Sequence, residues 1–483
     1  MSTAQVISPS DAGYEEARVS RIFNKRRPNK KPAGIFFPTS EDEVVAAVET
    51  AVQQGKRISV RSGGHSWAAW SLRDDCILID TSRLDTFQLD AERRLATVST
   101  AMTGGKLNGL LSKSGTGLAF LGGHCPDVGV GGFLLQGGQG WGCRFVGWAC
   151  EQIESFRVVL PPSSKNDHQV RVIECSRSQN ADLFWAARGC GPGFFGVITS
   201  FTLQLRKMPK LAGSVYFFDT EECYDELAPW YLQKCRDLQG RAEIVMIGFR
   251  SDKVLPHLSP VRNVILIRPL IFDYEDEAEG QAKLAEFEEG MPFLGSKHNH
   301  VHVLNEASSM ALEYERQWED NPNGRYWVQN AWLDGPLDKV ADTMAWAFKN
   351  IPSKATFVLH YSMDCKERHA LPKDMCFDVQ TDHTYSIYSI APEDTREEDE
   401  QCSSFVKQAF DIVDSRRPEE GGSVGIYLGD SDLTVRRSRF MGEENWTKWK
   451  RLRTEYDPKR MMVGYDGEDE KEDWNKEKWE TQT

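Results

Sequence analysis

The chain has 483 residues, and 72 acidic against 58 basic side chains give a formal net charge of −14. This length exceeds the usual limit for one hydrophobic core and predicts two domains. A hydrophobic content of 40%, with 11% aromatic residues, excludes disorder of the whole chain. The acidic balance argues against a nucleic-acid-binding protein. No run approaches the roughly 18–20 apolar residues of a membrane helix, so we expect no membrane partner.

The N-terminal residues and the cysteines predict the cellular compartment of the chain. The first residues lack the charged-then-apolar pattern of a secretory signal. The eleven cysteines contain no CxxC pair, and their odd number excludes complete intrachain pairing. We therefore expect a reduced, cytoplasmic chain that is a monomer or a homodimer. Residues 466–483 hold eight acidic residues and three lysines, and they are expected to form a disordered tail.

Helices and strands alternate in the N-terminal part. Ser40 and Glu43 form a predicted capping box, in which the serine accepts from the Glu43 amide and the glutamate reaches back to the cap. Valines at helical spacing continue this helix to Gly55. Strands are predicted at 57–61, 77–79, 96–98, 158–160 and 197–205, and glycine is dense between 115 and 147. The pattern is typical of an α+β or α/β fold.

Residues 207–210 form a plausible boundary, and the region up to 423 has a different character. Strand-like runs at 215–218, 244–249, 264–267, 357–361 and 385–390 alternate with helices. One helix begins at a second capping box, Thr395 with Glu398, and buries one apolar face. Strands in series with packed helices predict an antiparallel sheet covered on one side. A last helix near 446–453 ends before Pro458.

Two segments carry recognisable chemistry. At 61–66, successive small residues follow a strand, and the exposed backbone N–H groups of such a turn form a nest for phosphate oxygens. A tight glycine turn capped by His65 is the structural alternative. At 123–132, followed by glycines to 142, Cys125 lies in a second glycine-rich loop. The alternative there is a loop with one buried cysteine that acts as a small hydrophobic residue.

Together these segments resemble the berberine bridge enzyme family of the vanillyl-alcohol-oxidase-like FAD superfamily. The resemblance covers 14–206 and 424–465, and it includes DLFWAARG at 182–189, GFFGV at 193–197 and YDP at 456–458. It implies an α+β fold in which 1–206 and 424–465 form a two-part PCMH-type FAD-binding domain. Residues 207–423 would then form an α/β substrate domain with an antiparallel sheet covered by helices.

The resemblance also implies the cofactor and its ligands. FAD would be bound bicovalently, through His65 at the flavin 8α carbon and Cys125 at C6. Val128 would stand at the oxygen gate, where a small residue favours an oxidase. The implied cofactor-binding residues are Arg61, Ser62, Gly63, Gly64, His65, Ser66, Cys125, Val128, Gly129, Gly131, Gly132, Gly138, Gly140, Gly142, Val197 and Tyr427.

Three positions depart from the family pattern. Phe133 replaces a histidine that many relatives carry, and Trp67 replaces an active-site tyrosine. The residues Tyr427-Leu428-Gly429-Asp430 occupy the place of the family's usual Y-x-N-Y pattern. With fewer polar contacts to the reduced flavin, the reduction potential of the flavin is expected to be lower than in relatives that keep these residues. The departures also weaken the inference that this chain shares its substrate with those relatives.

Other motifs have simpler interpretations. The segment 191–196 matches the dinucleotide-binding pattern G-x-G-x-x-G. That pattern requires a strand before it and a helix after it, whereas here a helix is predicted before it and a strand after it. The reversed order argues against NAD binding. His298, His300 and His302 share one strand face, and no metal site is predicted for them. The basic run 25–31 is expected to be solvated, and the sequon at 445–447 matters only after secretion.

The catalytic base is sought in the strand 357–364. Tyr361, His360 and Tyr427 are the candidates, with His360 and Tyr361 on opposite strand faces. His383 and Tyr385 are further possibilities, and Glu367 lies near the expected position of the family's glutamate base. The predicted function is an FAD-dependent oxidase that transfers a hydride from a small aromatic or hydrophobic natural product and reduces oxygen to hydrogen peroxide. A carbohydrate or alcohol oxidase, or a non-redox cyclase with structural FAD, is the alternative.

Overall fold

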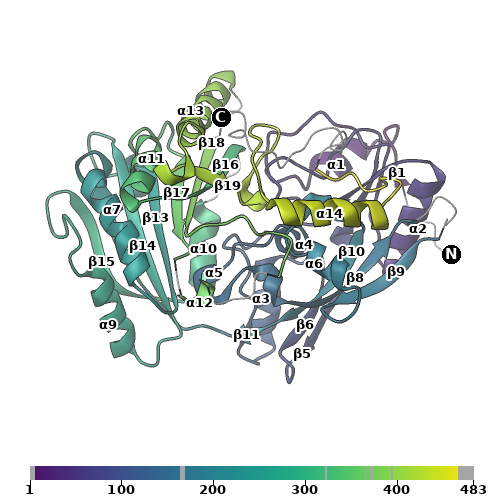
Figure 1. Cartoon of the computed structure of the whole chain (residues 1–483), viewed down its shortest axis with the longest axis horizontal. Coiled ribbons are helices and arrows are strands. Elements are labelled where there is room, and N and C mark those ends of the chain that lie inside the picture. Colours follow the sequence, from purple (N-terminus) through teal and green to yellow (C-terminus); the bar gives the residue numbers. More distant parts are fainter. Residues whose placement is uncertain are drawn as a thin grey trace.

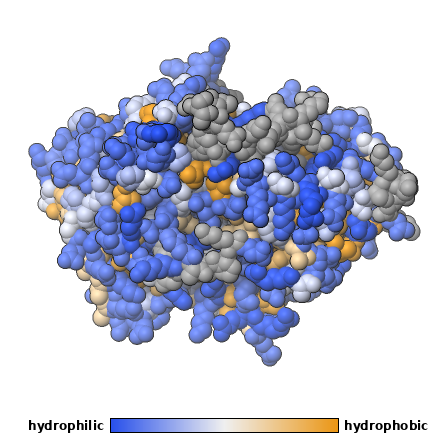
Figure 2. All heavy atoms as spheres, viewed as in Figure 1, coloured by the Kyte–Doolittle hydropathy of each residue, from blue (hydrophilic) through white to orange (hydrophobic). Residues whose placement is uncertain are grey.

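The strands of the chain form two groups, which lie side by side in Figure 1. The structure is a computed structural model that describes residues 6–163, 169–320, 324–364, 366–369, 374–392 and 395–465. The tail predicted at 466–483 lies outside these residues, as does the side chain of Glu367. Within the described ranges, no helix is long and apolar enough to cross a membrane. Figure 2 shows a face on which hydrophilic side chains predominate and apolar ones form small separate groups.

The first group contains three small sheets. The four-stranded sheet has the order β1 (Val6–Ile7), β2 (Gly34–Phe36), β4 (Ile77–Asp80), β3 (Ile58–Arg61), and all its pairs except β1–β2 are parallel. The five-stranded antiparallel sheet has the order β5 (Phe87–Asp90), β6 (Leu95–Ser99), β10 (Val197–Gln204), β8 (Ile153–Leu160), β9 (Arg171–Ser176). β7 (Leu118–Ala119) pairs with β11 (Arg206–Lys207). The helices are α1 (Tyr14–Val19), α2 (Glu41–Gln53), α3 (Gly104–Lys113), α4 (Val130–Leu135), α5 (Cys143–Val146) and α6 (Ala181–Ala186).

The predicted caps are found, with one correction. The side chain of Ser40 accepts a hydrogen bond from the Glu43 amide at 3.3 Å. The Glu43 carboxylate, however, accepts from the amide of Thr39 at 2.7 Å rather than from that of Ser40. It thus satisfies a donor one residue before the predicted one. The second helix begins as predicted, with the Thr395 side chain accepting from the Glu398 amide.

The second group is one eight-stranded antiparallel sheet. Its order is β15 (Asn299–Ser308), β12 (Leu211–Asp219), β14 (Asn263–Phe272), β13 (Ala242–Arg250), β17 (Phe357–Ser362), β18 (His383–Ala391), β16 (Arg325–Leu333), β19 (Ser423–Gly425). The associated helices are α7 (Thr220–Asp237), α8 (Ser251–Val254), α9 (Glu277–Glu288), α10 (Met310–Asp320), α11 (Leu337–Lys349), α12 (Lys366–His369) and α13 (Arg396–Asp414). The predicted antiparallel sheet covered by helices is confirmed.

Side-chain alternation divides the residues of this sheet between its two faces. On β13, Ile244 and Met246 join the core beneath α7, α11 and α13. Their neighbours Val245 and Ile247 point the other way, toward the N-terminal part. One face of the sheet is therefore a conventional core, whereas the other is an apolar wall.

The last segment returns to the N-terminal part, where α14 (Glu443–Tyr456) lies across it in Figure 1. The indole N–H of Trp449 donates to the carbonyl of Gly193 at 3.1 Å. The hydroxyl of Tyr465 donates to the carbonyl of Cys190 at 2.8 Å. Both ends of the chain thus contribute to the same body.

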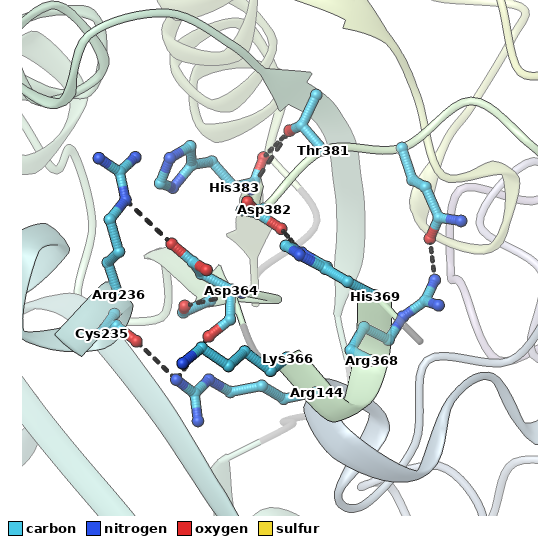
Figure 3. Close-up of polar contacts among 12 residues, drawn as sticks. Arg144, Cys235, Arg236, Asp364, Lys366, Arg368, His369, Thr381, Asp382 and His383 are labelled. Atoms are coloured by element: carbon cyan, nitrogen blue, oxygen red, sulfur yellow. Dashed lines mark hydrogen bonds and ion pairs between the residues drawn. The ribbon is translucent and has the colours of Figure 1, made fainter. Parts of the chain in front are cut away.

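Arg144 joins the two groups of strands. It lies in α5 and is fully buried. One guanidinium nitrogen donates to the carbonyls of Cys235, Leu238 and Asp364 at 2.5–2.6 Å, and Figure 3 shows part of this contact. A buried cation with several carbonyl acceptors acts as a fixed link between the N-terminal part and the sheet.

We predict that Arg144→Met lowers the free energy of unfolding by about 3 kcal/mol, because buried carbonyls lose a charged donor. Urea unfolding followed by tryptophan fluorescence measures the change. Arg241→Met is the matched control, because the Arg241 side chain is 57% exposed and forms a surface ion pair with Asp273 at 2.7 Å. Equal stability of the two variants would contradict the proposed link.

Candidate active site

A cavity of about 650 Å³ lies between the N-terminal part and the uncovered face of the eight-stranded sheet. Its sheet wall is largely apolar, with Glu243, Arg268 and Tyr361 as polar members of the same strand faces. This wall is formed by Val215, Phe217, Val245, Ile247, Leu266, Phe357 and Leu359. The opposite wall carries the two glycine-rich loops that the sequence singled out. A cavity of this size with a few polar groups on apolar walls is typical of a small-molecule site.

The two loops cross with backbone packed directly against backbone. A Cβ added at Gly63 would lie 2.6 Å from the amide nitrogen of Gly129, and one at Gly129 would lie 2.6 Å from the Gly63 Cα. The Ser62 hydroxyl accepts from the amide of Gly132 at 3.2 Å and adds a second tie. Glycine is required at this crossing because any side chain would push the loops apart.

His65 and Cys125 both line the cavity as a result. Phe23 stacks on the His65 ring with centroids 3.9 Å apart. A Cβ at Gly132 would meet only the Ser62 hydroxyl, at 3.9 Å, so the bare backbone there faces the open cavity. A glycine cradle beside a nucleophilic histidine and cysteine fits a large planar cofactor with phosphate groups.

The predicted cofactor-binding residues separate into two sets. Arg61, Ser62, Gly63, Gly64, His65, Ser66, Cys125, Val128, Gly131, Gly132 and Tyr427 line the cavity. The remaining ones, Gly129, Gly138, Gly140, Gly142 and Val197, are not among its lining residues. Gly140, for example, packs against the Gly122 carbonyl and supports the loop from behind. The Arg61 guanidinium is engaged by Asp80 at 2.5 Å, so it holds the fold together instead of reaching for a ligand.

The structure separates the catalytic candidates according to strand face. Tyr361 lines the cavity. His360 points to the opposite face, where it is fully buried, and its Nδ1 lies 3.1 Å from the Tyr231 hydroxyl of α7. His360 is thus shielded from the cavity by its own strand, and we do not propose it as a catalytic residue. His383 is bound to it, with Nδ1 3.3 Å from the His360 Nε2. Tyr385 lies in the same helix-covered core.

Tyr427 reaches the cavity as expected. Its hydroxyl accepts from the amide of Gln139 at 3.1 Å, and its backbone is held by Asn330. Burial raises the pKa of this phenol well above its ordinary value. Tyr427 is therefore a neutral, positioned side chain near neutral pH.

Two residues that the sequence did not single out form a polar pair in the cavity. His124 Nε2 lies 2.9 Å from the Glu243 carboxylate, which also accepts from the Gly142 amide at 2.8 Å. Burial alone raises the pKa of Glu243, but attraction and hydrogen bonding from His124 outweigh it and hold the pKa below 4.5. The Tyr361 hydroxyl lies near this carboxylate without a well-aligned hydrogen bond. A carboxylate–imidazole pair in a cavity is a common proton-accepting unit.

Two of the three departures from the family pattern contact each other. The Trp67 indole donates to Asp430 at 3.2 Å, and the Tyr388 hydroxyl donates to the same carboxylate at 2.7 Å. Burial raises the pKa of Asp430. The third departure, Phe133, also lines the cavity. Trp67 and Asp430 thus form, with Tyr388, a second polar group of the cavity.

The histidines with possible metal-ligand spacing are engaged by acids. His298 and His300 both contact Asp219, at 3.1 and 2.8 Å, and His302 contacts Glu288. A different group, Asp364, His369 and Asp382, brings its ligand atoms within 4.8 Å of one another. Figure 3 shows that these three side chains converge near Arg236, which binds Asp364, while His369 binds Asp382 at 2.7 Å.

Comparison with known proteins identifies the cofactor class. Residues 32–165 match a family model described as an FAD binding domain. The FAD-linked oxidoreductase ptmO of Penicillium ochrochloron is 31% identical over 436 residues, covering 89% of each chain. The xylooligosaccharide oxidase of Thermothelomyces thermophilus is 36% identical over 189 residues, covering 39% of this chain and 36% of that one.

Solved structures show the same fold. CrmK, a flavoenzyme of caerulomycin biosynthesis, matches with a TM-score of 0.79 at 21% identity, covering 96% of this chain and 99% of that one. The wild-type BBE-like 1 of Physcomitrella patens matches with a TM-score of 0.76 at 18% identity, covering 95% of each chain. The expected PCMH-type architecture is thereby confirmed.

We predict that Glu243→Gln lowers the free energy of unfolding by about 1–3 kcal/mol at pH 7, because the half-buried imidazole of His124 and the buried amide of Gly142 lose a charged acceptor. A carboxyl whose pKa is depressed in the folded state stabilises that state above its ordinary pKa and loses this contribution as the pH falls. The difference from wild type should therefore shrink below about pH 4.5. Urea unfolding at pH 7 and pH 4 measures it, with the exposed Glu286→Gln as control. A difference that is independent of pH would contradict the ionised state of Glu243.

Proposed function

Because the chain belongs to the FAD-linked oxidoreductases and has the fold of a BBE-like protein, we propose that it is an oxidase acting on a small hydrophobic or aromatic molecule. The observation that carries the proposal is the cavity shared by His65, Cys125 and the His124–Glu243 pair. Its apolar sheet wall supports an aromatic or hydrophobic natural product over a polar sugar.

The flavin would be held covalently at two points, by His65 at the 8α carbon and by Cys125 at C6. Both residues line the same cavity, which supports this assignment. When bound, FAD supplies the acceptor for two electrons, and oxygen takes them away as hydrogen peroxide. Val128 lines the cavity as a small side chain, which supports access for oxygen.

The chain's own part in the reaction is proton transfer and positioning. Glu243 holds Nε2 of His124, so Nδ1 is the nitrogen that accepts a proton from a substrate O–H or N–H group. The Tyr361 hydroxyl, which lacks a well-aligned partner, donates a hydrogen bond to the same substrate group. The sheet wall binds the apolar part of the molecule and keeps water from it.

Oxygen consumption with a substrate panel tests the proposal. We expect aromatic alcohols, phenols or alkaloid-like amines to be oxidised with one peroxide formed for each product, and mono- and oligosaccharides to remain unchanged. His124→Gln should lower kcat/KM by about 10²–10⁴-fold, the usual contribution of a general base. The exposed His257→Gln serves as control.

The other outcomes select the alternatives. Oxidation of oligosaccharides alone would favour a carbohydrate oxidase, the activity in the name of one relative. A product isomeric with its substrate, without peroxide, would identify a non-redox cyclase in which FAD is structural. Either result would overturn the proposal.

A further inference from the structure

Asp127 contacts the ring that the proposed function attaches to flavin. Its Oδ1 lies 3.3 Å from Nε2 of His65, a distance typical of an ion pair. The nitrogen is buried, and the two atoms are not aligned as a hydrogen bond. Asp127 is only two residues after Cys125, so one loop carries both the cysteine and this carboxylate.

The carboxylate contacts His65 without being part of the cavity lining. His65 and Cys125 are among the lining residues, whereas Asp127 is not. Phe23 covers one face of the imidazole at 3.9 Å with an interplanar angle of 18°, and Trp67 meets it edge-on at 5.6 Å. These contacts fix the ring plane, and Asp127 lies at the Nε2 side of the ring.

This arrangement determines the state of the imidazole. Burial raises the pKa of Asp127, but the His65 imidazole 3.3 Å away outweighs this effect and holds the pKa below its ordinary value. An ionised carboxylate at Nε2 favours the tautomer with the proton on Nε2. Nδ1 then keeps its lone pair and is the nucleophilic nitrogen.

We propose that Asp127 is a positioning residue for covalent flavin attachment, which it promotes by placing its negative charge beside Nε2 of His65 and leaving Nδ1 to form the bond. The inference rests on the proposed function, because it assumes that FAD occupies the cavity and is linked to His65. It goes further by giving a role in attachment to Asp127, a residue that does not line the cavity.

The chemistry balances with oxygen as the oxidant. A bond forms between Nδ1 and the flavin 8α carbon, and one C–H bond of the 8-methyl group breaks. The departing proton goes to solvent, and the positive charge of the alkylated imidazole is shared with Asp127 through Nε2–H. The two electrons of the broken C–H bond reduce the ring system, and oxygen then removes them as hydrogen peroxide.

The test measures attachment without any substrate. The holoenzyme is purified at fixed times after induction, and trypsin releases residues 62–73 as the peptide containing His65. Mass spectrometry gives the fraction of this peptide that carries flavin. We expect Asp127→Ala to slow attachment by about 10- to 100-fold, the usual effect of losing the partner that orients a histidine ligand. Asp127→Glu should restore most of the rate, and the linkage should be at Nδ1.

The control is Asp85→Ala, whose carboxylate is exposed and faces Lys106. Total FAD, bound covalently or not, should be equal in all variants. The positioning role would be overturned if Asp127→Ala attached flavin at the wild-type rate. It would also be overturned if the variant lost total FAD in proportion to its loss of covalent attachment. Should the alanine variant fail to fold, Asp127→Asn makes the same comparison, because it keeps the shape and removes the charge. A wild-type enzyme that holds FAD with peptide 62–73 unmodified would instead refute the proposed attachment.

Discussion

The backbone contact between Gly63 and Gly129 is the constraint on which the candidate site depends. The loop after β3 and the loop before α4 cross at a distance that leaves no room for a Cβ atom. His65 follows Gly63 in one loop and Cys125 precedes Gly129 in the other, so both side chains line the same cavity. A larger residue at either glycine would separate the loops and the two side chains with them.

The second constraint is the twofold alternation of the eight-stranded sheet. Its helix-covered face is a core in which His360 and His383 contact each other, whereas the next residue, Tyr361, faces the cavity. The same alternation gives the cavity a largely apolar wall that also carries Glu243 and Arg268. The polar groups of the cavity are the His124–Glu243 pair, the cluster of Asp430 with Trp67 and Tyr388, and the ion pairs of Glu313 with Arg268 and Arg316.

Local patterns predicted the fold better than they predicted the polar contacts. Three predictions that depend only on neighbouring residues are confirmed. They are the cap at Ser40, the strand around 244–249, and the strand that follows the glycine motif at 191–196. Glu243 gave no signal because it lies within an apolar strand, and its partner His124 is more than a hundred residues away. The strand 357–364 predicted opposite faces for His360 and Tyr361, but only the packed helices show which face is closed.

One measurement tests the central claim, that the two loops deliver His65 and Cys125 to the same flavin. Trypsin separates them into peptides 62–73 and 114–144. Mass spectrometry of the acid-precipitated holoenzyme should find a single species in which both peptides are joined through one FAD. Free FAD in the supernatant, with both peptides at their unmodified masses, would contradict the account.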